Sequence, residues 1–267
     1  MKRIFLIFLA SITALLAFPQ ENDSIIVLQS PAGRLSGLID IQDLVNEGNN
    51  YWENEFKGHW AGVELGINGF YNSDYSMYLP EEKDFLSNDL IRSNILNLNF
   101  LQYSKGLQST RNTIGIVTGV GLSLQSYRLD KNTTLRVDDY GKIQPVNLFF
   151  DANQKSKFSI VYLEVPLLVE FQIPIKNLAN RLYFSAGINA GKRLSAHTKI
   201  KYRSANKKEK LKSPGDYSLR DYKFAGTIRV GYRWLNLFTS FDFTALFDDR
   251  RGPRLYPFSA GIRLISF

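Results

Sequence analysis

Side chains that could carry acid–base or nucleophilic chemistry are sparse in this chain of 267 residues, which has two histidines and no cysteine. A serine nucleophile needs a base within hydrogen-bonding reach and a third group that orients the base. His197 with Ser195 and the acidic residue Asp216 is the one conceivable set. Because such spacing is generic, we expect no catalytic residues.

The remaining candidates for chemistry lie too far apart to cooperate. Glu164 and Glu170 are six residues apart, which is about 20 Å along an extended strand and too far for a paired acid and base. His59 and His197 should lie at opposite ends of their strands, more than roughly 20 Å apart. With two histidines and no thiolate, little material remains for a zinc site. We therefore expect no metal and no cofactor.

A strict alternation of residue types identifies the element that holds the two glutamates. Between 161 and 173 every odd position is apolar, whereas the even positions include Glu164, Pro166, Glu170 and Gln172. A period of two over this length predicts one β-strand with two different faces. Pro166 cannot donate a backbone hydrogen bond, so we expect a bulge or a missing bond there.

Seven other segments repeat this pattern, and the connections between them alternate in length. The eight expected strands are 59–71, 94–103, 113–127, 158–173, 181–193, 222–233, 236–246 and 257–266. Long connections follow the first, third and fifth strands, and short ones follow the second, fourth and sixth. Long loops on one rim and short turns on the other are typical of outer-membrane barrels. The pattern predicts an all-β fold, an eight-stranded antiparallel up-and-down transmembrane β-barrel.

The two faces of these strands differ in chemistry. One face is apolar and should meet lipid, because the backbone groups of a closed sheet are already paired. The other combines glycine with charge, and eight strands leave an interior just wide enough for side chains. We expect these charges to pair in a lumen ionic network, since lone buried charges would cost several kcal/mol each. Its predicted members are Glu64, Glu164, Glu170, Arg193, Arg229, Arg233, Asp242 and Arg263.

This network predicts a barrel filled by side chains, without an open diffusion pore. His59, which neighbours Trp60, is interpreted as a residue of the membrane interface. A soluble lipocalin-type barrel with its faces exchanged is the alternative architecture. The glycine-rich polar face and the alternating loop lengths favour the membrane barrel.

The N-terminus has the layout of a secretory signal. Basic Lys2 and Arg3 precede an apolar run that ends near Phe18, which is too short to span a bilayer as a helix. We expect a signal peptide at 1–20, a short N-terminal periplasmic segment at 21–56 and the barrel domain at 57–267. The mature protein should reside in the bacterial outer membrane.

Charge is unevenly distributed along the chain, whose formal net charge is +8. The run 199–220 contains eight Lys or Arg residues and two acidic residues, whereas 74–92 contains five acidic residues. Such runs usually form solvated loops, and a basic loop beside a membrane can contact phosphate-bearing headgroups. The expected partners are outer-membrane lipids, with lipopolysaccharide as a candidate at 199–220, and an envelope protein. No nucleic-acid motif is present.

Three segments carry a family resemblance: 58–69 (GHWAGVELGING), 97–104 (NLNFLQYS) and 162–167 (YLEVPL). Together they resemble the PorT-like outer-membrane β-barrel family of Bacteroidetes-type bacteria, over roughly residues 57–267. The resemblance implies an eight-stranded barrel in the outer membrane. One namesake of this family is associated with a protein secretion system, but no motif here transfers that role.

Three hypotheses for function follow. The first is a non-enzymatic outer-membrane barrel whose three long extracellular loops bind a ligand or brace the membrane. The second is an accessory component of an outer-membrane protein secretion machine. The third is an outer-membrane lipid-modifying hydrolase that uses His197.

Overall fold

The computed structural model describes residues 56–108, 112–148, 154–175, 177–204 and 207–266. The expected signal peptide at 1–20 and, apart from Phe56, the expected periplasmic segment at 21–56 lie outside these residues. The one helix among them is the 3₁₀ turn η1, Pro80–Glu82. No helix in this part of the chain is long and apolar enough to cross a membrane.

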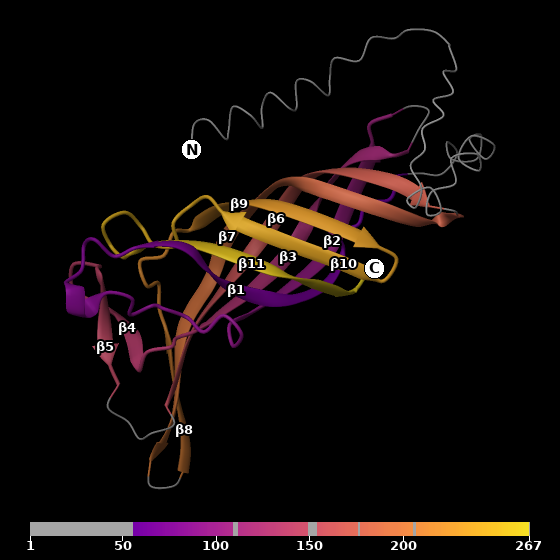
Figure 1. The fold of residues 1–267 in the computed structure, drawn as a ribbon. Helices are drawn as coiled ribbons and strands as arrows, with labels where there is room; N and C mark the ends of the chain where they lie inside the picture. Colours follow the sequence, from indigo (N-terminus) through magenta and orange to yellow (C-terminus); the bar gives the residue numbers. More distant parts are fainter. Residues whose placement is uncertain (1–55, 109–111, 149–153, 176, 205–206, 267) are drawn as a thin grey trace, which may run out of the picture. The chain divides into compact units, whose positions relative to one another are not determined.

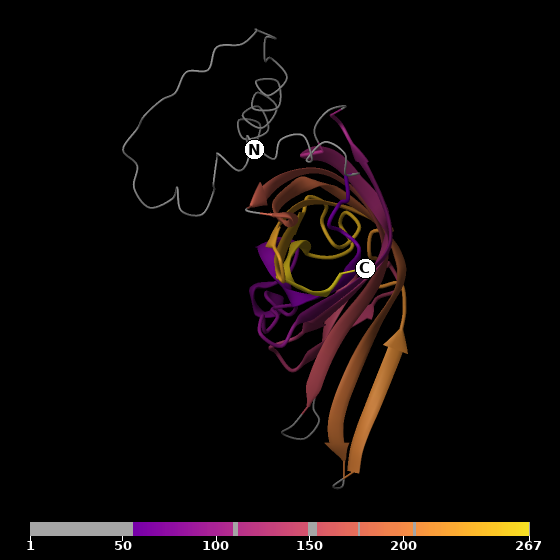
Figure 2. The same ribbon diagram turned by 90° about the vertical axis from the view of Figure 1, so that its right-hand side faces the viewer.

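Eight antiparallel strands form a closed ring, as the alternating pattern predicted (Figure 1). Around the ring they follow the order β6-β3-β2-β1-β11-β10-β9-β7, and pairing of β6 with β7 closes it. Figure 2 shows the ring viewed approximately along the barrel axis. The strands are β1 (Gly62–Asp74), β2 (Asn94–Gly106), β3 (Ile114–Arg128), β6 (Lys155–Ile175), β7 (Asn177–Ser204), β9 (Tyr222–Tyr232), β10 (Leu235–Asp242) and β11 (Arg254–Ile265).

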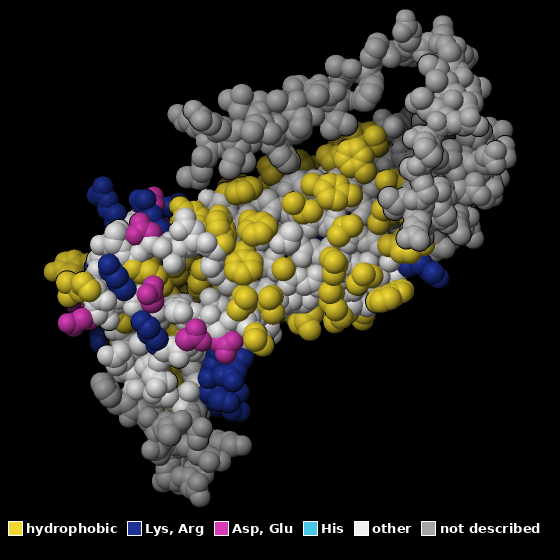
Figure 3. Space-filling model, viewed as in Figure 1, with side chains coloured by type: hydrophobic (Ala, Val, Ile, Leu, Met, Phe, Trp, Pro, Cys, Tyr) yellow, Lys and Arg dark blue, Asp and Glu magenta, His cyan; other side chains and the backbone are white. Residues whose placement is uncertain are grey.

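The ring has an apolar outer wall and a polar inner wall. Outward side chains form a belt that Figure 3 shows in yellow. Its members include Leu65, Ile67, Leu101, Leu124, Val165, Leu167, Val169, Ile173, Phe184, Ile188, Phe224, Ile228, Val230, Leu237, Phe241, Ile262 and Leu264, all more than a third exposed. The residues between them point inward and are mostly buried. On β6 this apolar belt covers 161–173.

The ladder around Pro166 is interrupted, as its missing N–H predicts. Pairing of β3 with β6 runs to Thr118 opposite Leu167 and resumes at Gly121 opposite Glu164. The hydroxyl of Thr118 donates to the carbonyl oxygen of Pro166 at 2.7 Å, inside the gap. No register shift occurs there, because the missing pairs leave the alternation of faces intact.

Long connections at one end of the barrel, the long-loop end, are folded into a cap. It contains η1, the hairpin β4–β5 (Thr133–Val137 and Ile143–Asn147) and the β10–β11 connection. Their aromatic and aliphatic side chains pack together with those of β3, β6 and β7 in a buried core. The cap core includes Tyr75, Tyr78, Phe85, Leu86, Leu135, Ile143, Tyr217, Leu219, Leu246, Phe247 and Leu255. The described residues of the expected long connections therefore contribute to a packed cap.

The basic run 199–220 differs from the expected loop. β7 continues as a strand to Ser204 and pairs with an additional strand, β8 (Lys207–Pro214). Residues 155–157 of β6 flank the same stretch of β7 on its other side. The high charge of this segment favoured a solvated loop. Its basic residues nevertheless alternate with other residue types, and backbone pairing between strands does not require apolar side chains. Figure 1 shows β8 extending away from the barrel, in a direction that crosses that of the barrel strands.

Candidate functional site

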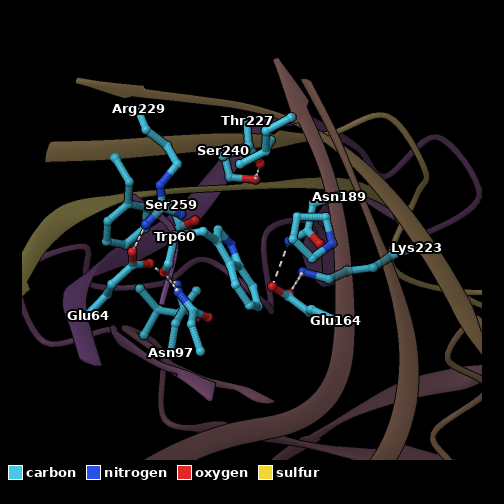
Figure 4. Close-up of a pocket in the computed structure, with 15 residues that line it drawn as sticks. Trp60, Glu64, Asn97, Glu164, Asn189, Lys223, Thr227, Arg229, Ser240 and Ser259 are labelled. Atoms are coloured by element: carbon cyan, nitrogen blue, oxygen red, sulfur yellow. Dashed lines mark hydrogen bonds and ion pairs between the residues drawn. The ribbon is translucent and has the colours of Figure 1, made fainter. Parts of the chain in front are cut away.

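The centre of the lumen is crossed by two buried ion pairs (Figure 4). Arg229 of β9 pairs with Glu64 of β1, whose second oxygen accepts from the Asn97 amide at 3.1 Å. Both charged residues point inward by the strand alternation, and they are 4% and 1% exposed. A charge at this depth needs a partner, because desolvation of a lone ion costs several kcal/mol.

Lys223 of β9 supplies the second cation. Its Nζ lies 2.7 Å from Oε1 of Glu164, and the Asn189 amide donates to Oε2 at 2.6 Å. The ammonium also lies 4.7 Å from the centre of the Tyr162 ring. Sequence reasoning omitted Lys223, although it shares the parity of Arg229 and Thr227 on the same strand.

These two pairs leave little space between them. They line a cavity of about 20 Å³ together with Trp60, Asn97 and Phe238, among others. A void of that volume holds about one water molecule. Asp242 is also buried in the lumen, close enough to Lys223 to attract it. The lumen at this level is filled by side chains.

His59 lies at the end of the barrel that carries the short turns, which we call the short-turn end. Our interpretation of His59 as a residue of the membrane interface is wrong, because its contacts are inside the barrel. Its Nδ1 lies 2.7 Å from Oε1 of Glu170, and its backbone N–H donates to Oε2 at 3.1 Å. The imidazole stacks on the Tyr183 ring, with centroids 4.3 Å apart. Gln172 extends this chain of contacts, since it donates to Glu170 and accepts from Arg181. His59 therefore lies inside the mouth of the barrel.

Arg263 of β11 also lies in the lumen but binds neutral groups. It donates to the carbonyl of His59, the hydroxyl of Tyr183 and the side-chain oxygen of Asn236, all within 2.9 Å. Its guanidinium thus fixes the residues that enter the barrel from the N-terminal side. The expected carboxylate partner is replaced by these three acceptors.

The residues just before β1 fill the lumen at the short-turn end. Phe56 and Trp60 are both buried, against Val117 and Leu168. The glycines of β3 make this possible: a Cβ on Gly115 would lie 2.3 Å from the Phe56 ring, and one on Gly119 would lie 2.5 Å from the Trp60 ring. These glycines provide space for an aromatic plug, which we define as residues 56–60.

Two predicted members of the lumen network lie elsewhere. Arg193 pairs with Asp216 and Asp221, acids of the β8–β9 connection at the long-loop rim. Arg233 is exposed in the β9–β10 turn, where its φ of 55° is left-handed. The two errors have different causes: Arg193 keeps the inward parity of β7 but meets acids at the rim, whereas Arg233 lies just past the end of β9.

The conceivable catalytic set is not assembled. Among the hydrogen bonds of the described residues, none joins His197 to Ser195 or Asp216. Asp216 is held by Arg193 instead. Burial, followed by repulsion from Lys212 and Lys199, lowers the pKa of His197 below its usual 6.5. The described residues also contain no cluster of three His or acidic groups that could hold a metal ion.

A closed antiparallel ring with an apolar outer belt and a charged, filled interior defines the class of outer-membrane β-barrels. The family model of the outer membrane protein beta-barrel domain matches residues 53–248. The chain belongs to this family and is located in the bacterial outer membrane. No curated protein and no solved structure matches it.

Proposed function

We propose that this protein is a non-enzymatic outer-membrane barrel with a sealed lumen, which presents an ordered cap to the outside for binding or for bracing the membrane. The observation that carries this proposal is the filled interior: two buried ion pairs leave room for about one water between them, and the aromatic plug closes one end. A lumen of this kind cannot conduct solutes while the pairs remain in place.

The cap supports a binding role. In this topology the long-loop end faces the exterior of the cell. Its core contains edge-on aromatic pairs such as Tyr75 with Phe85 and Phe158 with Tyr217. A pre-ordered surface loses less entropy on binding than mobile loops do. Apolar side chains that remain on its surface, Ile91 and Tyr140, are 89% and 93% exposed.

The resemblance to PorT-like barrels supports a protein partner in the envelope as a more specific form of the proposal. Its test is recovery of the full chain from native membranes in mild detergent, followed by identification of bound proteins. Stoichiometric recovery of a secretion component would favour the accessory role. Recovery of the barrel alone would remove that role and leave the binding or bracing role.

Lipid contact belongs to the same proposal. The run 199–220 extends from the rim just beyond the apolar belt, where phosphate-bearing headgroups lie. It would anchor the long-loop end at the outer-leaflet surface, with lipopolysaccharide as the candidate lipid.

The sealed lumen is tested by planar-bilayer recording of the purified full-length protein. We expect no stable conductance steps, because ions would have to displace the pairs of Glu64 with Arg229 and Glu164 with Lys223. Reproducible steps of pore size in wild-type protein would overturn the proposal. An eight-stranded outer-membrane pore of known conductance serves as the positive control.

A further inference from the structure

Six lysines form a regular grid on the β6–β7–β8 ribbon. Lys157 of β6 pairs with Lys199 of β7, which pairs with Lys212 of β8. Two residues further from the barrel, Lys155 pairs with Lys201, and Lys201 with Lys210. Directly paired residues point to one face of a sheet. We call these six residues the lysine grid.

The grid is compact. Adjacent strands lie about 4.8 Å apart, and residues two apart on one strand lie about 7 Å apart. Three strands and two rows therefore place six ammonium groups on a face about 10 by 7 Å at the backbone. Long side chains can converge from this area onto one anionic group.

The lysines of the grid have no acidic partner in the part of the chain that the structure describes. Among the ion pairs of the described residues, none includes any of the six lysines. The pKa of Lys157, which lies beyond the apolar belt, is lowered by burial and then by repulsion from Arg128, Lys201 and Lys199. Glu209, the acid on β8, accepts from the Tyr202 hydroxyl. Asp89 and Asp130 lie near Arg128, at the edge of the grid.

Such an arrangement is unfavourable in isolation. Like charges directly opposite each other on neighbouring strands destabilise a sheet, and the six lysines of the grid make four such pairings. An anion that binds the grid would convert the repulsion into attraction. Binding of an anion would therefore explain why the lysines are placed opposite one another.

The position of the grid identifies the source of that anion. Its lysines have the same parity on β6 as Val161 and Leu163, so they lie on the outer wall. Lys157 is four residues from Val161, where the apolar belt ends. Figure 3 shows Lys and Arg side chains gathered beside the end of the belt, on the side from which β8 extends in Figure 1. This is the headgroup level of the outer leaflet.

We propose that the lysine grid is a binding site for the phosphate of a lipid A-type glycolipid headgroup in the outer leaflet. This inference rests on the proposed lipid contact of 199–220 and deepens it. It extends the site to Lys155 and Lys157 on β6 and names the chemical group. The bend of the ribbon across the barrel axis allows the grid face to lie along the membrane surface.

The test uses the full-length protein and two variants. The grid variant carries Lys157→Ala, Lys199→Ala and Lys212→Ala. The control variant carries Lys83→Ala, Lys131→Ala and Arg136→Ala, three cap cations outside the grid. Each is titrated with lipid A, with chemically dephosphorylated lipid A and with inorganic phosphate, and bound lipid is counted by native mass spectrometry.

We expect wild type and control to bind lipid A, and the grid variant to bind it roughly 100-fold more weakly, because each lysine beside an anionic surface contributes about a factor of five. Dephosphorylated lipid A should bind all three proteins weakly. Equal binding of both lipids, or equal losses in grid and control variants, would overturn the proposal. Tight binding of inorganic phosphate alone would also contradict it by indicating a soluble ligand.

Folding and the proposed function are checked separately. Removal of like charges should leave the unfolding temperature of the grid variant unchanged or higher, so lost binding cannot be attributed to misfolding. Conductance of the three proteins tests the sealed lumen independently. A conducting wild type would overturn the sealed-lumen proposal while the lipid result stands, and loss of lipid A selectivity would do the reverse.

Discussion

At the scale of single residues, the lumen shows that a small barrel can bury charged side chains when each has a partner of opposite charge. Glu164 interacts with one cation, Lys223, and with an amide from Asn189. Asp242 is attracted by the same cation. Lys223 therefore compensates two carboxylates.

Replacement of Lys223 by methionine should lower the free energy of unfolding by about 3–5 kcal/mol, the usual cost of breaking a buried pair by removing one partner. Adding Glu164→Gln should restore much of that loss, because the orphaned carboxylate is then neutral. Denaturant unfolding in detergent micelles provides the measurement. Lys192→Met, on the exposed outer face of β7, is the matched control and should not lower stability. A double variant no better than Lys223→Met would contradict the pairing.

His197 reports on the lysine grid without any ligand. Its pKa is lowered by burial and then by Lys212 and Lys199. The variant Lys199→Ala with Lys212→Ala should raise the His197 pKa toward its usual 6.5, since the repulsion that favours the neutral imidazole is removed. An NMR titration of the imidazole signal measures this, with His59→Gln to assign the two histidines. Lys83→Ala should leave the titration unchanged, and an unaltered pKa in the lysine variant would refute the proximity.

At the scale of elements, β3 and the residues before β1 are matched in shape. Gly115 and Gly119 lie on the inner face where Phe56 and Trp60 enter the lumen. A strand interior loses packing at glycine, and here the aromatic rings of another segment restore it. The glycines and the aromatic plug should therefore depend on each other.

Gly115→Val should destabilise the barrel by about 1–3 kcal/mol, the usual cost of overpacking, because its side chain would displace the Phe56 ring. Combined with Phe56→Ala, the loss should be smaller than the sum of the two single losses. Unfolding of the single and double variants gives the coupling. Gly187, whose Cβ would meet the backbone of Leu167, is the control: Gly187→Ala with Phe56→Ala should be additive. Additivity at Gly115 would show that the ring does not occupy that space.

All eight barrel strands could be predicted from alternation alone, because a sheet with one face in lipid and one in a filled lumen imposes a strict period of two. The extension of β7 and the existence of β8 could not. Basic residues alternate with Ile200 and Tyr202 there as well, but so much charge is equally compatible with a solvated loop, and pairing with the neighbouring strands decides. The sequence also could not predict which acidic and basic side chains pair in the lumen. Bulges at Asn99/Leu101 and Val161/Tyr162 shift the register, so sequence spacing does not show which charges meet.

At the scale of the whole barrel, charge is separated by surface. Inside, carboxylates are paired with cations, whereas the lysines of the grid take part in none of the ion pairs of the described residues. The first arrangement stabilises a filled interior, and the second favours the binding of an external anion that we propose. Both follow from the same period of two, which assigns neighbouring residues to opposite walls.

The interior is filled at two levels along the barrel, by the aromatic plug at the short-turn end and by the two ion pairs in the centre. Removal of the plug by Phe56→Ala with Trp60→Ala should therefore leave planar bilayers non-conducting, because the pairs of Glu64 with Arg229 and Glu164 with Lys223 still block the path. Further loss of Glu64, Arg229, Glu164 and Lys223 to alanine, in a variant that still folds by its heat-dependent gel mobility, should produce ion conductance because the centre of the lumen is then open. Conductance steps in the plug variant alone would mean that the aromatic plug, and not the charged centre, is the seal.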